Sequence, residues 1–366
     1  MSKKNAHLIA LASSVLTDRH RHTITAVVEE IGVGEQEDTV INQLMPITDR
    51  PSGVLEHEIL HASGGKTQER VIGAPGKSVV GPSSTSKLYK PGSYQEFSSI
   101  TENDLLNLRK LGSIGERGAT GLTAGELSWV ERIAVKLQLR LGNRLRQLRW
   151  DAMFTGAFVY QDQTFNFGIP VANKITLTDW EVAGADPFKD LVSVLANNPK
   201  LRKYKNLIKG FVINPKTEAD IIQRSLEKGY IANANIHSAG INVVKTFAAP
   251  GLPDFITVGD VTAEETVTDE GEVVLGDATF LVPDNKILVV MDFNKASAKF
   301  PMYGEMQITE NLNDPSATLD KPATGIYAFL DEEGLRDRKS PGVDYVAGFN
   351  GGPNLMRPND VFILEY

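Results

Sequence analysis

The sequence predicts an α+β protein with more than one domain, and three observations lead to this prediction. A helical pattern of apolar residues runs from Thr123 to Phe154, which is much longer than an average helix. Between residues 186 and 300, capped helices alternate with short apolar runs that are typical of buried strands. The chain has 366 residues, a length that usually divides into two or three cores.

Composition and charge exclude several classes of protein. The formal net charge is -8, whereas proteins that mainly hold nucleic acid usually carry a basic excess. The chain has no cysteine, so it can form neither a disulfide nor a thiolate metal site, which fits a reducing cytoplasm. The apolar patch from Leu8 to Leu11 is shorter than a signal-peptide core of roughly 7–15 residues, and no run reaches the ~18 apolar residues of a membrane helix.

Residues 1–62 are predicted to form an N-terminal arm and a first strand. The arm carries a basic cluster from Arg19 to His22, a short β-prone run from Ile24 to Val28, and an acidic stretch from Glu35 to Asp38. A mixed segment of this kind depends on neighbours for its order.

Residues 63–99 are predicted to form an extended loop. The segment is rich in Gly, Ser, Thr, Pro and Lys, and its β-prone pieces, such as Lys87 to Tyr89, alternate with turn formers. It has too few apolar residues to bury a core of its own. Two interpretations remain: a disordered linker, or a projecting β-hairpin that another subunit stabilises. The recurring aromatic and β-branched residues favour the hairpin.

The long helix, predicted over residues 123–154, belongs to a region that spans residues 100–185. Thr123 and Glu126 form a capping-box pattern at its start, and Thr155-Gly156 is expected to end it. At 1.5 Å per residue its length is roughly 45 Å, more than a small domain spans. Its apolar residues recur every three or four positions: Leu127, Val130, Ala134, Leu137, Leu141, Leu145, Leu148 and Ala152.

The region 186–300 is predicted to be one compact α+β domain. Asp186-Pro187 and Asn214-Pro215 each combine an N-cap residue with proline at the first helical position, so each should open a helix. The first should stop at Asn198-Pro199 and the second at Gly229. Within this domain, strands are expected at Gly210 to Ile213, Ile241 to Phe247, Phe255 to Val258, Thr279 to Val282 and Ile287 to Met291. A β stretch is expected before it, at Phe158 to Pro170. In the last region, 301–366, strands are expected at Met306 to Thr309 and Val361 to Leu364.

One motif points to zinc chemistry. His57-Glu58-Ile59-Leu60-His61 matches H-E-x-x-H, in which two histidines one helical turn apart bind zinc and the glutamate activates water. The pattern requires a helix, yet Pro51, Gly53 and Gly64-Gly65 flank it. On a strand the two histidines would lie ~13 Å apart, too far for one metal ion. A zinc hydrolase is therefore the alternative function, and our main prediction contains no metal, cofactor or catalytic residue.

Charged residues cluster in two further places. Arg132, Lys136, Arg140 and Arg144 recur every four residues along the long helix. Such a stripe is a solvated face, a contact with a neighbouring subunit, or a DNA-binding surface. An acidic run from Glu264 to Asp277 lacks the spacing of a calcium loop, and we interpret it as a solvated loop.

Five short motifs, in order along the chain, resemble the phage major capsid protein E family. The resemblance spans about residue 60 to the C-terminus. Ser84 to Gly92 resembles the return of an extended loop, and Trp150 to Gly156 resembles the end of a spine helix. Asp186-Pro187 resembles the start of the first axial-domain helix, Phe280 to Lys286 resembles a strand-turn, and Gly352 to Phe362 resembles the last strand. The resemblance implies the HK97-like capsid fold, with an N-terminal arm, extended β-hairpin loop, long spine helix, and peripheral and axial domains.

The resemblance also implies a structural function. Subunits would form hexamers and pentamers that tile an icosahedral shell, a virion capsid assembled in the host cytoplasm around double-stranded DNA without sequence-specific binding. Scaffold, portal and decoration proteins are the implied partners, and no membrane is involved. A cellular nanocompartment shell of the same fold remains an alternative.

The residues expected to make assembly contacts lie on the loop and the long helix. They are Lys66, Lys77, Lys87, Tyr89, Lys90, Arg132, Lys136, Arg140 and Arg144. Some shells of this fold cross-link a loop lysine to an asparagine, here Asn350 or Asn354, although the lambda-like branch is not known for this. Deleting Lys66 to Tyr94 is expected to leave a folded subunit that does not assemble.

Overall fold

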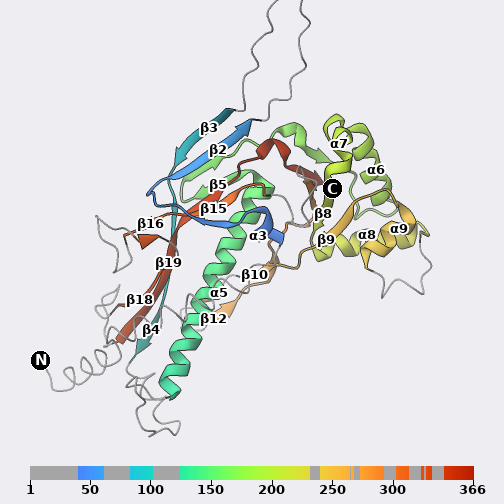
Figure 1. The fold of residues 1–366 in the computed structure, drawn as a ribbon. Helices are drawn as coiled ribbons and strands as arrows, with labels where there is room; N and C mark the ends of the chain where they lie inside the picture. The colour runs from blue at the N-terminus through green and yellow to red at the C-terminus, as the bar shows by residue number, and fades with distance from the viewer. Residues whose placement is uncertain are drawn as a thin grey trace, which may run out of the picture.

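The protein is described from a computed structural model. The described residues are 40–61, 83–101, 124–230, 240–263, 265–267, 273–291, 302–312, 323–324, 327–331 and 342–366. Residues 1–39 of the predicted arm and residues 63–82 of the predicted extended loop, with Lys66 and Lys77, therefore lie outside the described residues. Figure 1 shows two sheets, one on each side of the upper end of a long helix.

The first sheet is built around one long strand, β19 (Gly342–Asn354), and has five strands. Along one edge β19 pairs with β4 (Gly92–Thr101), and along the other with β18 (Tyr327–Asp331) and β15 (Glu305–Ile308), all antiparallel. The short strand β1 (Ile47–Asp49) adds to β15 in parallel. Segments from both ends of the chain therefore share this sheet.

The long helix α5 (Ala124–Thr155) runs beside this sheet, as Figure 1 shows. Its bounds confirm the helix predicted over residues 123–154. The buried leucines Leu137, Leu141, Leu145 and Leu148 confirm the second part of the predicted apolar stripe, whose first part lies among side chains outside the described residues. The helix ends at Gly156, whose φ of 73° is the left-handed conformation that glycine adopts without steric cost, and whose N–H donates to the carbonyl of Ala152.

The second sheet also has five strands, and they come from distant parts of the chain. In spatial order they are β7 (Lys174–Thr176), β20 (Phe362–Glu365), β14 (Lys286–Met291), β8 (Ile208–Ile213) and β9 (Asp254–Thr257). The two outer pairs are parallel and the two inner pairs antiparallel. The C-terminal strand β20 thus lies beside β14, inside this sheet.

Helices pack on one face of the second sheet. They are α6 (Pro187–Asn197), α7 (Pro199–Lys203), α8 (Pro215–Glu227) and α9 (Ile241–Ala248). The caps predicted for α6 and α8 are confirmed: the Asp186 side chain accepts from the N–H of Lys189, and the Asn214 side chain accepts from that of Thr217. Asn198 ends α6 as predicted, but its side chain also caps α7.

The strand predicted from Ile241 to Phe247 is wrong, because this segment is helix α9. Its β-branched residues suggested a strand, since they are typical of one. However, Ile241, Val244 and Lys245 are buried at the three- and four-residue spacing of a helix, facing the second sheet, while Val243 and Phe247 are exposed. Burial of that face outweighs the weak local preference for a strand.

The two sheets share a core because β14 is buried on both faces. Leu288 and Val290 belong to the same apolar cluster as α5 and the first sheet. Ile287, Val289 and Met291 belong to the cluster under the helices. This strand therefore reads as an uninterrupted apolar run, as strands with two buried faces do.

Short elements complete the fold. The helix α3 (Val40–Leu44) packs against α5. Five two-stranded sheets are β2 (Leu55–His61) with β3 (Ser83–Tyr89), β5 (Ala157–Tyr160) with β6 (Gln163–Asn166), β10 (Val261–Thr262) with β13 (Thr279–Phe280), β11 (Glu265–Val267) with β12 (Val273–Leu275), and β16 (Glu310–Asn311) with β17 (Ala323–Thr324). The 3-10 helices are η1 (Val171–Asn173), η2 (Lys205–Leu207) and η4 (Pro358–Asp360).

The α+β class predicted from the sequence is confirmed. From β2 onward the elements also follow the predicted order: a hairpin, a long helix, an α+β region, and a return to strands. Within the described part of the chain, no helix has the length and apolar character needed to cross a membrane.

One prediction concerns the close contact between β15 and the end of β19. A Cβ atom added to Gly304 would lie 2.1 Å from the carbonyl oxygen of Asn354, a backbone atom that cannot move aside. We expect Gly304→Ala to lower the free energy of unfolding by about 1–3 kcal/mol, measured by urea denaturation. Gly259→Ala is the matched control, because the nearest atom there lies 4.0 Å away. Equal stability of the two variants would contradict this packing.

Candidate functional site

The candidate functional site is the base of the hairpin formed by β2 and β3. The two strands pair in an unbroken antiparallel register from Leu55–Tyr89 to His61–Ser83. In Figure 1 they lie at the upper edge of the first sheet. Among the described residues these strands pair only with each other, so side chains must attach the hairpin to the rest of the subunit.

The first attachment is made by the side chain of Gln307 on β15. Its amide oxygen accepts from the N–H of Glu56 at 3.1 Å, and its amide nitrogen donates to the carbonyl of Glu56 at 3.0 Å. One side chain thus satisfies both backbone groups of Glu56, as a neighbouring strand would. Gln307 is itself 1% exposed, and such buried amide bonds are costly to break.

Two more attachments reach the end of β19. Nδ1 of His57 donates to Oδ1 of Asn354 at 2.9 Å, and the hydroxyl of Tyr89 donates to the carbonyl of Pro353. His57 and Asn354 are both 1% exposed. The hairpin is therefore held on both of its strands, through His57 on β2 and Tyr89 on β3.

The β5–β6 hairpin supplies an aromatic surface beneath these contacts. The ring of Tyr89 stacks on Phe165 with centroids 4.3 Å apart. The ring of His57 lies 5.3 Å from Phe165 and 5.1 Å from Phe167. This apolar setting disfavours a charged imidazole, so burial lowers the pKa of His57, assisted by the charge of Lys87 and opposed by the bond to Asn354. His57 is neutral at pH 7.

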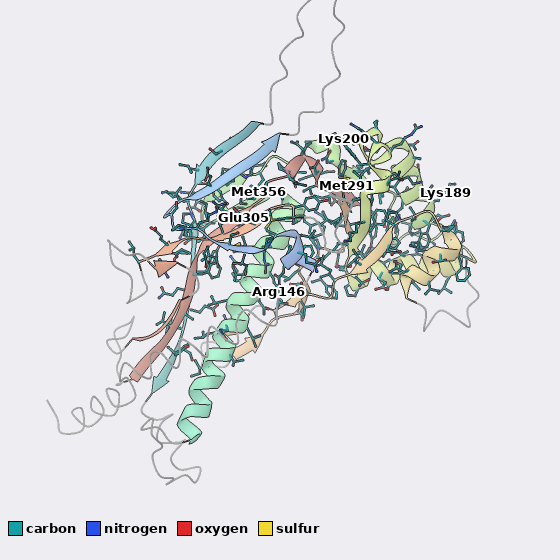
Figure 2. All side chains as sticks on the ribbon, viewed as in Figure 1. Arg146, Lys189, Lys200, Met291, Glu305 and Met356 are labelled. Atoms are coloured by element: carbon teal, nitrogen blue, oxygen red, sulfur yellow. The ribbon has the colours of Figure 1, made fainter. Side chains whose placement is uncertain are left out.

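A buried carboxylate, Glu305, stands next to Gln307. It accepts from Thr48 at 2.9 Å, from Arg50 at 2.8 Å, and from Gln307 at 2.7 Å. Burial alone would raise the pKa of Glu305, but these donors outweigh burial and hold it below its usual value. Figure 2 shows Glu305 between the hairpin and α3, where it links β1 to the hairpin attachment through Gln307.

The zinc site considered for His57, Glu58 and His61 is not supported, because its helical premise is wrong. These residues lie on strand β2, where a four-residue separation spans ~13 Å. His57 is buried against two phenylalanines and bonded to Asn354. Within the described parts of the chain, no group of three His, Cys, Asp or Glu residues could hold a metal ion.

The predicted contact residues of the loop separate into two groups. Lys87 and Lys90 are exposed at the hairpin base, where Leu88 is 69% exposed. Tyr89, by contrast, is buried in its own subunit, where it anchors the hairpin; its role in a contact with a neighbour stays a prediction. The physical reason is the strand alternation, which points Tyr89 inward and Leu88 outward.

The basic stripe of α5 is partly used within the subunit. Arg140 forms an ion pair with Glu96 on β4, and the guanidinium of Arg144 lies 5.0 Å from the ring centroid of Tyr94 on the same strand. Lys136 is exposed, and the side chain of Arg132 lies outside the described residues. Both residues therefore contact β4, which passes directly beside this face of α5, while Arg144 is also exposed; their role in subunit contacts stays a prediction.

Further along α5, Arg149 is fully buried. It donates to the carbonyl of Leu145 at 3.0 Å and to that of Met45 at 3.2 Å, and also bonds the side chain of Asn42. Burial, with a smaller effect of Arg146, lowers the pKa of Arg149 to about 10, so it stays protonated at pH 7. Through these hydrogen bonds Arg149 ties α3 and the residue after it, Met45, to the long helix.

Sequence reasoning missed Gln307 and Asn354, which complete the hairpin attachment. One signal was present: Glu305 and Gln307 alternate with Met306 and Ile308, so both polar residues share one face of strand β15, which begins one residue before the strand predicted from Met306 to Thr309. A polar pair on a strand that is otherwise apolar indicates a buried hydrogen-bonding network. No comparable pattern marked Asn354. Asn354, one of the two asparagines considered for a cross-link, is buried and bonded to His57, and the cross-link itself stays a prediction.

Solved structures of similar fold were found, all at low sequence identity. A putative capsid protein of an Escherichia coli prophage is 9% identical with a TM-score of 0.49, covering 93% of this chain and 96% of that chain. A virus-like particle from Pyrococcus furiosus is 12% identical with a TM-score of 0.45, covering 94% and 99%. An encapsulin complex from Synechococcus elongatus is 10% identical with a TM-score of 0.41, covering 89% and 86%. No family model matches the sequence, and no curated protein matches it.

The neutral state of His57 leads to a pH prediction. An unfolded histidine takes up a proton near pH 6.5, whereas the buried His57 resists protonation because its pKa is lowered. Below that pH the unfolded chain binds more protons, so His57 makes the free energy of unfolding fall as the pH falls from 7 toward 5.

We expect His57→Phe to lower the free energy of unfolding at pH 7 by about 1–3 kcal/mol, through the lost bond to Asn354. Between pH 7 and pH 5 the free energy of unfolding should also fall less in the variant than in the wild type. Urea denaturation of both proteins at several pH values measures this difference. Subtracting its profile from that of the wild type removes the contributions of the other histidines. Two parallel profiles would show that His57 is not the group responsible.

Proposed function

We propose that the chain is the major subunit of a self-assembling capsid shell with the HK97-like arrangement, and that its function is structural. The observation that carries this proposal is the β2–β3 hairpin, which is firmly attached at its base yet pairs with no other described strand. An isolated two-stranded hairpin is marginally stable in water, and the outward face of this hairpin carries the exposed Leu88, so we expect a neighbouring subunit to cover that face.

The outer surface of the hairpin base is suited to such a neighbour. Leu88 on β3 is 69% exposed and Val159 on β5 is 58% exposed. A groove beside β3 is lined by Tyr160 and Phe165 together with Lys90. Exposed apolar groups rimmed by polar ones are typical of surfaces that contact another protein.

The rest of the subunit provides a rigid support for the hairpin. The carboxyl-terminal half of α5 is buried among residues of both sheets, so the two sheets and the helix move together. Hydrogen bonds from Gln307, His57 and Tyr89 then fix the direction in which the hairpin leaves this support. Such a subunit can reach a neighbour in one orientation, which a repeating shell requires.

In the proposed assembly, subunits form hexamers and pentamers that close an icosahedral shell around double-stranded DNA. The net charge of -8 fits a shell that encloses a polyanion without binding it tightly. The charged residues that we propose for contacts with neighbours are Lys66, Lys77, Lys87, Lys90, Arg132, Lys136, Arg140 and Arg144. Scaffold, portal and decoration proteins are the proposed partners, the virion capsid is the proposed location, and the host cytoplasm is the proposed site of assembly.

The proposal is tested by negative-stain electron microscopy of protein purified from an expressing lysate, beside size-exclusion chromatography. We expect closed shells tens of nanometres across, or rings of five and six subunits. Nucleic acid inside shells from infected or induced cells identifies a virion. Enclosed protein instead identifies a nanocompartment shell of the same fold. A protein that stays monomeric with its scaffold coexpressed contradicts the proposal.

A shortened hairpin tests the observation that carries the proposal. The deletion of Lys66 to Tyr94 considered above would remove β3 and the start of β4, including the buried Tyr89, and should therefore damage the fold. The better variant replaces residues 62–82 with Asn-Gly, because His61 and Ser83 are directly paired and a two-residue turn can join them.

We expect this variant to keep the circular dichroism of the wild type and to form no shells. A control replaces residues 62–82 with a Gly/Ser segment of the same length, which separates the need for these side chains from the need for a long loop. Normal shells from the shortened variant would contradict an assembly role for the hairpin. Loss of folding would show that the base depends on residues 62–82.

A further inference from the structure

Opposite charges lie at the two ends of the second sheet. Its strands β7, β20, β8 and β9 run in one direction, and β14 runs in the other. The amino ends of four strands therefore meet at one end of the sheet, and their carboxyl ends meet at the other. Strand β8 has six residues, so the two ends are about 20 Å apart.

The amino ends of the strands carry a surface of positive charge. Lys174 begins β7, and α7 and η2 lead directly into β8. Lys200 of α7 donates at 3.2 Å to Asn173, the residue before β7, which places α7 at this end of the sheet. Figure 2 shows Lys200 at the top of the domain. Four exposed residues at this end are called here the basic surface: Lys174, Arg202, Lys203 and Lys205.

Within the parts of the chain that the structure describes, no ion pair joins the basic surface to an acidic side chain. Lys174 donates to the carbonyl of Thr155 at 3.2 Å, and the ammonium of Lys203 lies 5.1 Å from the ring centroid of Tyr204. Both partners are uncharged. Like charges that lie close together repel one another, and a neighbour of opposite charge relieves that repulsion.

Two carboxylates near the same end already have partners. Asp254, which begins β9, forms an ion pair with Lys245. Burial raises the pKa of Asp360, and the charges of Arg357 and Lys200 oppose that rise. Lys200 therefore acts within its own subunit and is not counted in the basic surface.

The carboxyl ends of the strands carry a surface of negative charge. The segment that follows β7 meets the first turn of α8, which follows β8, because Glu181 pairs with Lys216 at 2.9 Å. Four residues at this end, exposed or half-buried, are called here the acidic surface: Asp179, Glu181, Asp220 and Asp284. Glu365 is not counted, because it pairs with Lys286 at 3.7 Å.

One ammonium group lies among these carboxylates and does not balance them. The hydrogen bond to Glu181 raises the pKa of Lys216, and the charges of Asp284 and Asp220 add to this rise. One positive charge thus faces three negative ones. This end of the sheet stays negative, as the opposite end stays positive.

Each charged surface also has an exposed valine beside it. Val171, in η1 just before Lys174, is 85% exposed, and Val182, next to Glu181, is 57% exposed. A contact that joined the two ends would remove both side chains from water, which is favourable and independent of charge.

The two surfaces cannot reach each other within one subunit. They are separated by the length of β8, and Figure 1 shows α7 at the top of this domain and α8 at its lower side. Between two subunits the basic end of one sheet can face the acidic end of another.

We propose that the basic surface of one copy binds the acidic surface of a second copy. Because the two surfaces are different parts of the same domain, the contact is head-to-tail, and repeating it generates a ring when the rotation closes. This inference rests on the proposed shell function, since rings of five and six subunits are its building blocks. It assigns a contact to the second sheet, outside the hairpin of β2 and β3.

A second copy accounts for the charges better than a nucleic acid does. DNA would neutralise the basic surface alone and would leave the acidic surface and Val182 without a partner. The net charge of -8 also opposes binding to a polyanion at long range. A contact between copies neutralises both surfaces at once.

Charge reversal with a swap tests the proposal. The first variant is Lys203→Glu with Lys205→Glu, the second is Asp179→Lys with Glu181→Lys, and the third combines all four. At physiological ionic strength we expect each of the first two to need a roughly tenfold higher subunit concentration for half-assembly. The combined variant, whose net charge equals that of the wild type, should recover most of this loss. Sedimentation velocity, with electron microscopy of the products, measures the outcome.

The control is Lys189→Glu with Lys228→Glu, which makes the same change of net charge as the first variant with two other exposed lysines. Figure 2 shows Lys189 at the right of the domain, away from Lys200 at its top. The control should assemble like the wild type. If it is impaired as much as the first variant, or if the combined variant is not rescued, the pairing is wrong. Circular dichroism of every variant confirms that the subunit has folded.

The failures of the two proposals are distinguishable. A wild-type protein that forms neither rings nor shells overturns the shell function and this contact with it. A first or second variant that assembles like the wild type overturns the contact alone. If the first variant assembles normally but loses binding of a fluorescent DNA duplex that the wild type retains, the basic surface is a nucleic-acid site, and the contact is overturned as well.

Discussion

The rest of the structure depends on the burial of the carboxyl-terminal half of α5. Leu145, Leu148 and Met153 share one apolar cluster with Leu288 and Val290 of the second sheet and with Tyr345 and Phe349 of the first. Each fully buried aliphatic side chain contributes about 1.5–3 kcal/mol. Residues of both sheets pack on the apolar face of this half of the helix, so the subunit carries its charges and its hairpin at fixed positions.

That rigid core also explains how buried polar groups fix the direction in which the β2–β3 hairpin leaves the subunit. A buried hydrogen-bonding group that loses its partner costs about 1–3 kcal/mol, so Gln307, His57 and Asn354 tolerate few alternative arrangements. Their bonds to β2 determine where the hairpin begins. An apolar attachment would hold the hairpin equally tightly but would allow it to slide or rotate. The polar contacts therefore specify direction, while the aromatic surface of Phe165 and Phe167 supplies stability.

Local signals made much of the fold predictable. The α5 periodicity and the caps at Asp186 and Asn214 depend on residues close in sequence, and each prediction was confirmed. Helix α9 was missed because burial against a distant sheet decides its structure. The hairpin attachment was missed for the same reason, since His57 and Asn354 are 297 positions apart. Sequence spacing also could not reveal that β4 would occupy the basic face of α5.

The proposed contacts through exposed charged side chains, such as Lys87 and Lys136, give assembly a particular physical character. Exposed ion pairs contribute less than about 1 kcal/mol each and are screened over roughly 10 Å at moderate salt. A wrongly placed subunit held only by such pairs can therefore leave and bind again. The apolar groups at the hairpin base, such as Leu88 at 69% exposure, contribute through burial, which salt does not screen. Charge would thus select the neighbour and the register of a ring, and burial of the hairpin would then make the chosen arrangement persist.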